Sequence, residues 1–213
     1  TSPFQRLGAG SLGGKARGVA FLDQLLASEE FSGELAGMPV SVPQSVALTT
    51  DAFDEFIELS GLQPLLYDAQ VDDAAVFARF QAGTLPSWVQ RGLENIIDLF
   101  PYPLAVRSSS LLEDNLLHPF AGIYGTAMIG NADPDRGVRV RELERAVKYV
   151  YATTCFRNAR AYLANTSRRI EEEKMGVLIQ ELVGQRFDGR FYPHFSGVAQ
   201  SHNYYPIEPQ RPD

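Results

Sequence analysis

One short stretch in the middle of the chain constrains the fold more than any other. Leu104-Ala105-Val106 predicts a buried strand, and Arg107 and the three serines Ser108–Ser110 follow it directly. An arginine at the end of a buried strand is held rigidly, so its planar set of donors can be presented to an anion. The stretch therefore predicts a strand that delivers one cation into a group of hydroxyls.

Two interpretations of Arg107 stay open from this stretch alone. The chain continues to Gly122, and small residues let backbone amides approach phosphate oxygens closely, which favours a polyphosphate site. Alternatively, Arg107 pairs with Glu113 or Asp114 at the surface. Such pairs are common and contribute little.

A second stretch, at the start of the chain, also has a phosphate-binding layout. Four glycines lie close together and are followed by Lys15 and a predicted helix. In such a loop the backbone amides and the helix N-terminus face the anion, and the lysine supplies charge. The alternative is a flexible loop that ends in a solvated lysine. The glycines are Gly8, Gly10, Gly13 and Gly14, and the expected apolar face of the helix is Val19, Phe21, Leu22, Leu25 and Leu26.

Two familiar motifs are tested at this loop and rejected. Gly8–Gly13 satisfies the spacing GxGxxG, but a dinucleotide fingerprint also needs a strand before it. Only seven residues precede Gly8, so we expect no strand there. A P-loop fails as well, because Ala9 and Ala16 occupy positions that need Gly and Ser or Thr.

The remaining patterns mix strands and helices, which predicts an α+β fold. Thr49, Thr50 and Asp51 are candidate caps for a helix over 51–59, whose inward face includes Leu59. Further helices are expected over 73–81, 87–99 and 138–164, and strands over 46–48, 123–129, 175–183 and 191–199.

Composition excludes several classes of protein. A net charge of −7 argues against non-specific nucleic-acid binding, and no apolar run approaches the length that spans a membrane. Cys155 is the single cysteine of the 213 residues, which favours a reducing, cytoplasmic compartment. His118, His194 and His202 are scattered without metal-ligand spacing, so we assign no metal-binding residue.

Four short motifs in order now point to a family. They are Gly13-Gly14-Lys15, Ala105–Ser109 with Glu113-Asp114, Phe120–Gly122 with Thr126, and Val177–Val183 with Ser196–Ala199. In this order they resemble the N-terminal ATP-binding domain of the pyruvate phosphate dikinase and phosphoenolpyruvate synthase family. The resemblance spans Leu7 to about Ala199.

The resemblance implies a set of residues for the phosphates. Lys15 matches the lysine that contacts the ATP phosphates, and Arg107 matches the arginine that contacts the transferred phosphoryl group. Gly122 and Thr126 match the loop that covers the phosphates. That loop departs from the family, because the common Gly-Gln-Gln-Asp-Thr is here Gly122-Ile-Tyr-Gly-Thr126.

It also implies a set of residues for the base. Gln180 matches the glutamine of the hinge strand whose backbone reads the adenine edge. Glu181, Leu182 and Val183 continue that strand, where backbone and side chains border the base and the ribose.

The family's fold is ATP-grasp, with the nucleotide between two α+β lobes. We expect one lobe at residues 1–102 and a second, incomplete lobe at 103–213, with the C-terminal part of the domain missing. The family's Mg²⁺ ligands would then lie beyond Asp213. The phosphohistidine domain and the pyruvate-binding domain would lie downstream in the same longer protein.

These features predict the ATP-binding part of a phosphotransferase that moves a phosphoryl group from ATP to a histidine on a downstream domain. We expect weak or no catalysis from this part alone, and the acceptor is not encoded in it. The altered loop at Gly122–Thr126 motivates the alternative, a non-catalytic nucleotide-binding module of a larger regulatory protein.

Overall fold

The computed structural model describes residues 2–28, 39–68, 70–110, 122–164 and 174–198. They fall into two compact units, Thr1–Leu182 and Val183–Asp213, which are described separately. The first unit contains a five-stranded sheet with its helices, and the second contains a two-stranded hairpin. The expected boundary between residues 102 and 103 stays a prediction.

The sheet of the first unit is mixed. Its strands follow the order β1 (Phe4–Leu7), β2 (Ser45–Leu48), β5 (Met175–Glu181), β3 (Leu104–Ser110) and β4 (Thr126–Ile129). The β1 and β2 strands are parallel, and every other neighbouring pair is antiparallel. Together with the helices around it, this mixed sheet confirms the α+β class.

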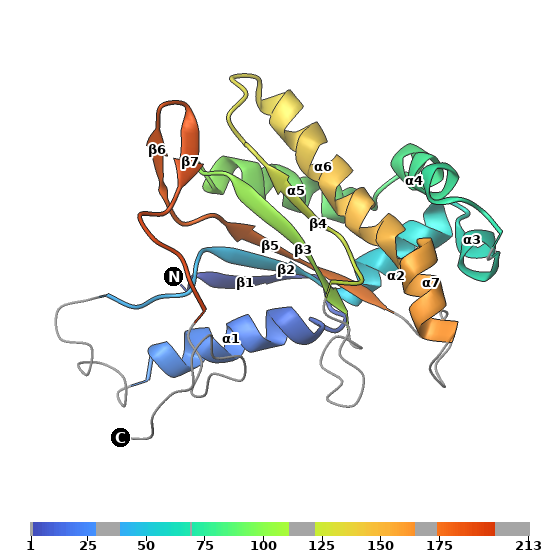
Figure 1. Ribbon diagram of the computed structural model, residues 1–213, viewed down its shortest axis with the longest axis horizontal. Coiled ribbons are helices and arrows are strands. Elements are labelled where there is room, and N and C mark those ends of the chain that lie inside the picture. Colours follow the sequence, from blue (N-terminus) through green and yellow to red (C-terminus); the bar gives the residue numbers. More distant parts are fainter. Residues whose placement is uncertain (1, 29–38, 69, 111–121, 165–173, 199–213) are drawn as a thin grey trace, which may run out of the picture. The chain divides into compact units, whose positions relative to one another are not determined.

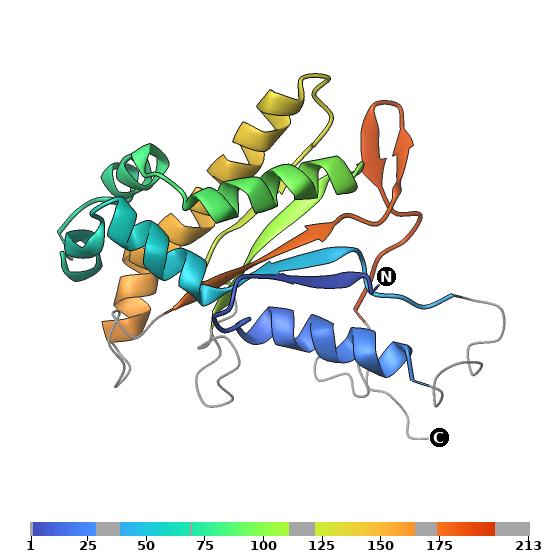
Figure 2. The same ribbon diagram turned by 180° about the vertical axis from the view of Figure 1, so that it is seen from behind.

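Helices cover both faces of this sheet. In both views α1 (Gly14–Leu26) lies along one face, whereas α5 (Ser87–Leu99) and α6 (Arg136–Ala152) lie along the other (Figures 1 and 2). The larger core lies on the side of α5 and α6 and includes Val106 and Ile179 of the central strands. The buried apolar cluster on the α1 side is smaller and consists of Ala16, Ala47 and Leu178.

An aromatic group fills the larger core where α6 meets α2 (Thr50–Leu59). The ring of Tyr151 lies 5.1 Å from that of Phe53 and 5.5 Å from that of Phe56. Such pairs contribute about 0.5–1.5 kcal/mol beyond their buried area. The inward assignment of Leu59 was wrong, because 57% of this residue is exposed.

The helix expected over 138–164 is broken into three pieces. After α6 come η1 (Thr153–Cys155) and α7 (Arg157–Ala164). The hydroxyls of Thr153 and Thr154 donate to the carbonyls of Val150 and Tyr151, at 2.6 and 2.7 Å, and the backbone becomes extended at Phe156. Local side-chain bonds of this kind compete with helix continuation. Two short helices, α3 (Gln63–Tyr67) and α4 (Asp73–Ala82), complete the first unit.

The second unit corrects the expected strand over 191–199. The observed hairpin is β6 (Gln185–Phe187) and β7 (Arg190–Tyr192). Asp188 and Gly189 join them with positive φ angles of 46° and 75°. Asp-Gly is the sequence signal for a tight hairpin turn of this type, so the sequence contained the information.

The start of the chain also differs from expectation. A strand, β1, does precede Gly8, so the stated reason for rejecting the dinucleotide fingerprint was wrong. In α1 the expected apolar face is only partly buried, because Phe21 is 63% and Leu22 is 48% exposed. The helix contacts the sheet mainly through small residues near its N-terminus, Gly14 and Ala16.

Candidate functional site

Arg107 lies on the face of the sheet that α1 covers. In the strand register it is opposite Leu178 of β5 on one side and Thr126 of β4 on the other. Residues directly opposite one another in antiparallel strands share a face. Since Leu178 packs with Ala16 of α1, Arg107 and Thr126 lie on this same face.

A row of polar side chains across three strands sets the direction of the Arg107 guanidinium. Its Nη1 donates to Oε1 of Gln180 at 3.2 Å, and Nε2 of Gln180 donates to Oγ of Ser45 at 3.1 Å. Only 9% of Gln180 is exposed, and its amide uses one acceptor and one donor in this row. The arginine is therefore held in place from one side.

Lys15 reaches the residue after Arg107 in β3 from the first turn of α1. Its Nζ donates to Oγ of Ser108 at 3.2 Å. Successive residues of a strand face opposite sides of the sheet, so this bond places Lys15 next to Arg107 along the strand without placing both side chains on one face. Both side chains supply charged donors of the kind that bind phosphate oxygens.

The second half of the glycine loop is fitted against the end of β3. A Cβ at Gly13 would lie 1.6 Å from the carbonyl oxygen of Ser109, and Gly13 has a φ of +72°. The hydroxyl of Ser109 donates to the carbonyl of Leu12 at 2.8 Å and accepts from the amide of Ala16 at 3.0 Å. Only glycine satisfies both the close approach and the backbone angles at position 13.

The first half of the loop is held by residues that were expected to cap a helix. Thr49 occupies the N-cap position of α2, as expected, but makes no side-chain capping bond. Its hydroxyl lies within hydrogen-bond distance of two acceptors, the carbonyl of Leu7 at 3.1 Å and Oδ1 of Asp51. Oγ1 of Thr50 accepts from the amide of Ser11 at 3.0 Å. The Thr49 hydroxyl thus serves the loop and the end of β1 rather than the helix amides.

Asp51 and Arg6 hold the same half of the loop through opposite charges. Oδ2 of Asp51 accepts from the amide of Ala9 at 2.8 Å. Nε and Nη2 of Arg6 donate to the carbonyls of Gly8 and Gly10 at 3.0 and 2.7 Å. Side chains of the protein thus occupy several backbone amides and carbonyls in this half of the loop. Fewer backbone groups are left to bind a ligand than the glycine-rich sequence suggests.

The charge of Asp51 is favoured by these contacts. Partial burial acts to raise the pKa of its carboxyl, but hydrogen bonds from Thr49 and from the amides of Ala9 and Gly10 outweigh burial and lower the pKa. The contacts that hold the loop therefore favour the ionised form of Asp51.

The other residues predicted for the base do not gather at this row. Glu181 follows Gln180 in β5, so its side chain points to the opposite face, where Oε1 accepts from the amide of Tyr102 at 3.3 Å. The amide of Leu182 donates to the carbonyl of Pro103 at 2.8 Å. Val183 begins the second unit.

The middle residues of the loop between Gly122 and Thr126 are held by the core. Gly122 is exposed with a φ of +79°, whereas Tyr124 is buried with 6% exposure. The amide of Gly125 donates to Oγ1 of Thr153 at 3.1 Å. Tyr124, one of the residues by which this loop departs from the pattern that the resemblance implies, is thus part of the core.

Glu113, Asp114 and His118 lie outside the described residues, as does His202. His194 packs against the ring of Phe187 at 5.7 Å.

Among the described residues, no three His, Cys, Asp or Glu side chains gather in a way that could hold a metal ion. Within that same part, the helices are too short or too polar to cross a membrane.

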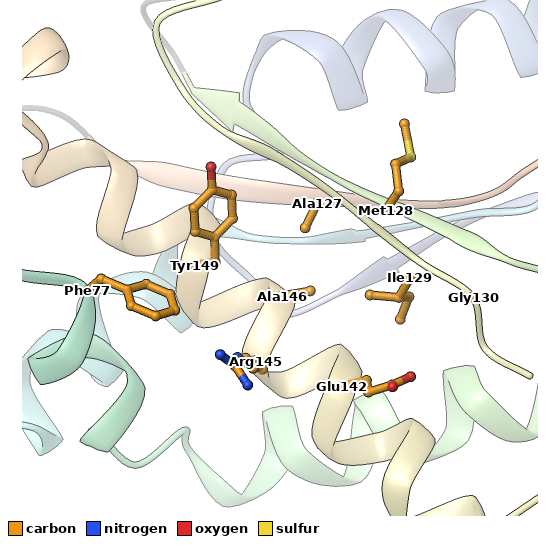
Figure 3. A pocket seen from close by; sticks show the side chains of 9 residues that line it. All are labelled: Phe77, Ala127, Met128, Ile129, Gly130, Glu142, Arg145, Ala146 and Tyr149. Atoms are coloured by element: carbon orange, nitrogen blue, oxygen red, sulfur yellow. The ribbon is translucent and has the colours of Figure 1, made fainter. Parts of the chain in front are cut away.

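A pocket of about 400 Å³ opens on the other face of β4, toward α6. Figure 3 shows Ala127 and Ile129 directed toward this helix, with Tyr149 beside Ala127 and Arg145 extending toward Phe77. The guanidinium of Arg145 lies 6.0 Å from the ring centre of Phe77. None of the predicted site residues is among those that line it, which are Phe77, Ala127, Met128, Ile129, Gly130, Glu142, Arg145, Ala146 and Tyr149.

Comparison with known proteins confirms the resemblance. Residues 9–211 match the family described as pyruvate phosphate dikinase, AMP/ATP-binding domain. The chain is also similar to phosphoenolpyruvate synthase of Escherichia coli (strain K12), with 33% identity over 142 residues. That alignment covers 58% of the chain and 17% of the enzyme, so the chain corresponds to a small part of its relative. Since the family match extends over nearly all of its residues, the chain belongs to the pyruvate phosphate dikinase AMP/ATP-binding domain family.

Proposed function

We propose that this chain is the ATP-binding part of a phosphotransferase similar to phosphoenolpyruvate synthase. In the complete protein, a phosphoryl group of ATP would pass to a histidine on a downstream domain. The observation that carries the proposal is the hydrogen bond from Lys15 to Ser108, the residue that follows Arg107 in β3. Phosphoryl transfer depends mostly on positioning and on neutralising the charge of the moving group, and two fixed cations serve both needs.

The residues divide the work between phosphate and base. Lys15 would bind the phosphate tail, and Arg107 would bind the phosphoryl group that is transferred. Thr126 lies opposite Arg107, and with Gly122 it belongs to the loop that would cover the phosphates. Gln180–Val183 would border the adenine, on an ATP-grasp fold whose lobes are residues 1–102 and 103–213.

The described residues suit the phosphates of ATP better than they suit Mg²⁺. The donors of Lys15, Ser108 and Arg107 suit a polyphosphate. Magnesium, when bound, would neutralise phosphate charge, but the described residues offer no cluster of carboxylates for it. The proposal therefore assigns no residue of this part to the metal.

Calorimetric titration of the full-length protein with ATP and Mg²⁺ tests the proposal. We expect Lys15→Ala and Arg107→Ala each to weaken binding by tenfold or more, since each removes a charged hydrogen-bond donor worth about 1.5–3 kcal/mol. Lys174→Ala and Arg136→Ala are matched controls, because these cations pair with Asp54 and Asp98 at the surface. Equal affinity of all four variants would show that the two cations do not bind the nucleotide.

The buried Tyr124 favours a second candidate, in which the domain binds nucleotide without transferring phosphate. The altered loop would then cover the phosphates without serving the transfer. Phosphohistidine formed by the full-length protein from ATP labelled in its phosphates separates the two functions. Labelled protein supports the phosphotransferase, and tight binding without any label supports the regulatory module.

A further inference from the structure

Building on the proposed function, we propose that Asp51, with Thr50 and Arg6, is a positioning residue that fixes the glycine loop and thereby places Lys15 for the phosphate tail. None of these three residues needs to touch the nucleotide. They act through the backbone of Gly8–Ser11, which leads directly into the lysine.

The contacts enclose this backbone from two sides. On one side, Asp51 and Thr50 accept from the amides of Ala9 and Ser11 at 2.8 and 3.0 Å, and the amide of Thr50 donates to the carbonyl of Ser11 at 3.0 Å. On the other side, Arg6 donates to consecutive carbonyls of the loop, those of Gly8, Ala9 and Gly10. Anionic and cationic side chains are thus matched to the donor and acceptor ends of the same peptide groups.

Two glycines of the loop also pack closely against the junction of β2 and α2. A Cβ at Gly10 would lie 2.6 Å from the backbone nitrogen of Asp51, and one at Gly8 would lie 2.0 Å from Oγ1 of Thr49. Either substitution would push the loop off the β2–α2 junction. The glycines of this half therefore serve close packing of the loop against its own protein.

Only a few residues separate the part of the loop that these side chains hold from Lys15. Ser11, the last residue held by Thr50, is four positions before Lys15, and Ser109 holds Leu12 and Ala16 between and beyond them. Lys15 has a long flexible side chain, which loses entropy when it binds. When the backbone before Lys15 is already fixed, less conformational entropy is lost as the lysine binds a phosphate.

The test compares ligands with and without phosphate in the full-length protein. We expect Asp51→Asn and Thr50→Val to weaken ATP binding about tenfold, while the affinity for adenosine stays the same. Thr50→Ser keeps the hydroxyl and should restore ATP binding. Asp54→Asn removes a carboxylate from the same helix, where it pairs with Lys174, and should leave both affinities unchanged.

An exposed variant guards against loss of folding. Arg6→Gln changes a surface side chain and should reproduce the selective loss of ATP affinity. Parallel weakening of ATP and adenosine, or unchanged ATP affinity in Asp51→Asn, Thr50→Val and Arg6→Gln, would overturn the positioning role while leaving the proposed function intact. Failure of the unsubstituted protein to bind ATP would instead remove the proposed function, and this inference with it.

Discussion

At the residue scale, Gly13 and Gly18 show two different situations for glycine within one short segment. Gly13 has φ +72° and ψ 176°, a combination that essentially only glycine adopts, and it touches the carbonyl of Ser109. Gly18 lies inside α1, and a Cβ there would meet nothing within 4 Å. The first glycine is required by the fold, whereas the second weakens a helix.

Alanine substitutions at these two positions should therefore change stability in opposite directions. We expect Gly13→Ala to lower the free energy of unfolding by about 1–3 kcal/mol from backbone strain, with the clash adding to it. Gly18→Ala should raise it by about 0.5–1 kcal/mol, since glycine is a poor helix former. Urea denaturation measures both, and a destabilised Gly18→Ala would contradict the packing described for α1.

Single residues were predictable where their neighbours in sequence define their role. Lys15 after its glycines and Arg107 after its apolar run were singled out this way. The structure places Arg107 inside β3 and bonds Lys15 of α1 to Ser108 beside it, while their role at a phosphate stays a prediction. Thr49 is the N-cap residue that was expected, but the bond of its hydroxyl to Leu7, 42 residues away, was not predictable. No local pattern distinguishes a threonine that caps its own helix from one that bonds a distant strand.

At the element scale, Thr153 ties the break between α6 and η1 to the loop that leads into β4. Its Oγ1 donates to the carbonyl of Val150 and accepts from the amide of Gly125, and only 2% of the residue is exposed. Thr153→Val keeps the shape but leaves that amide without this acceptor. We expect a loss of about 1–3 kcal/mol in unfolding free energy, with Thr153→Ser close to the parent. Denaturation curves that coincide for the valine and serine variants would contradict this role of the hydroxyl.

Elements were predictable in proportion to the strength of their own periodicity. The bounds expected for α5, Ser87–Leu99, agree with the structure, because four apolar residues repeat regularly along it. The strand β1 was missed, since four residues at a sheet edge carry little pattern and its existence depends on pairing with β2. The start of β4 was placed three residues too early and the end of β5 two residues too late, where turns rather than side-chain alternation decide.

At the scale of the whole molecule, two carboxyls give the stability opposite dependences on pH. Burial, opposed by the hydrogen bond from the Tyr102 amide, raises the pKa of Glu181 above its ordinary value of 4.5. The folded state then holds this proton more tightly than the unfolded state, so stability declines as pH rises from about 4.5 through the raised pKa. Asp51 acts in the other direction, because its pKa lies below 3.8 and its contribution is lost as pH falls through that lowered value.

Substitution should separate the two contributions. We expect Glu181→Gln to be more stable than the parent near pH 7 and about equal to it near pH 4. Asp51→Asn should be less stable than the parent near pH 7, and the difference should narrow at about pH 3. Unfolding free energies measured across this range decide the matter, and a pH-independent effect of either substitution would show that its charge is not the cause.

The strand order of the first unit has a consequence for the way the chain is made. The central strand β5 is the last of the five in sequence, and it is the one that joins β1 and β2 to β3 and β4. Until residues 175–181 have been synthesised, β2 and β3 both lack the strand that pairs with them in the folded sheet, so the backbone groups along these two strand edges stay unpaired. Pairing across such long separations is slow, because the closing of long loops must come first. We therefore expect the five-stranded sheet to form only once Met175–Glu181 is available, and the unpaired strands to be prone to aggregation until then.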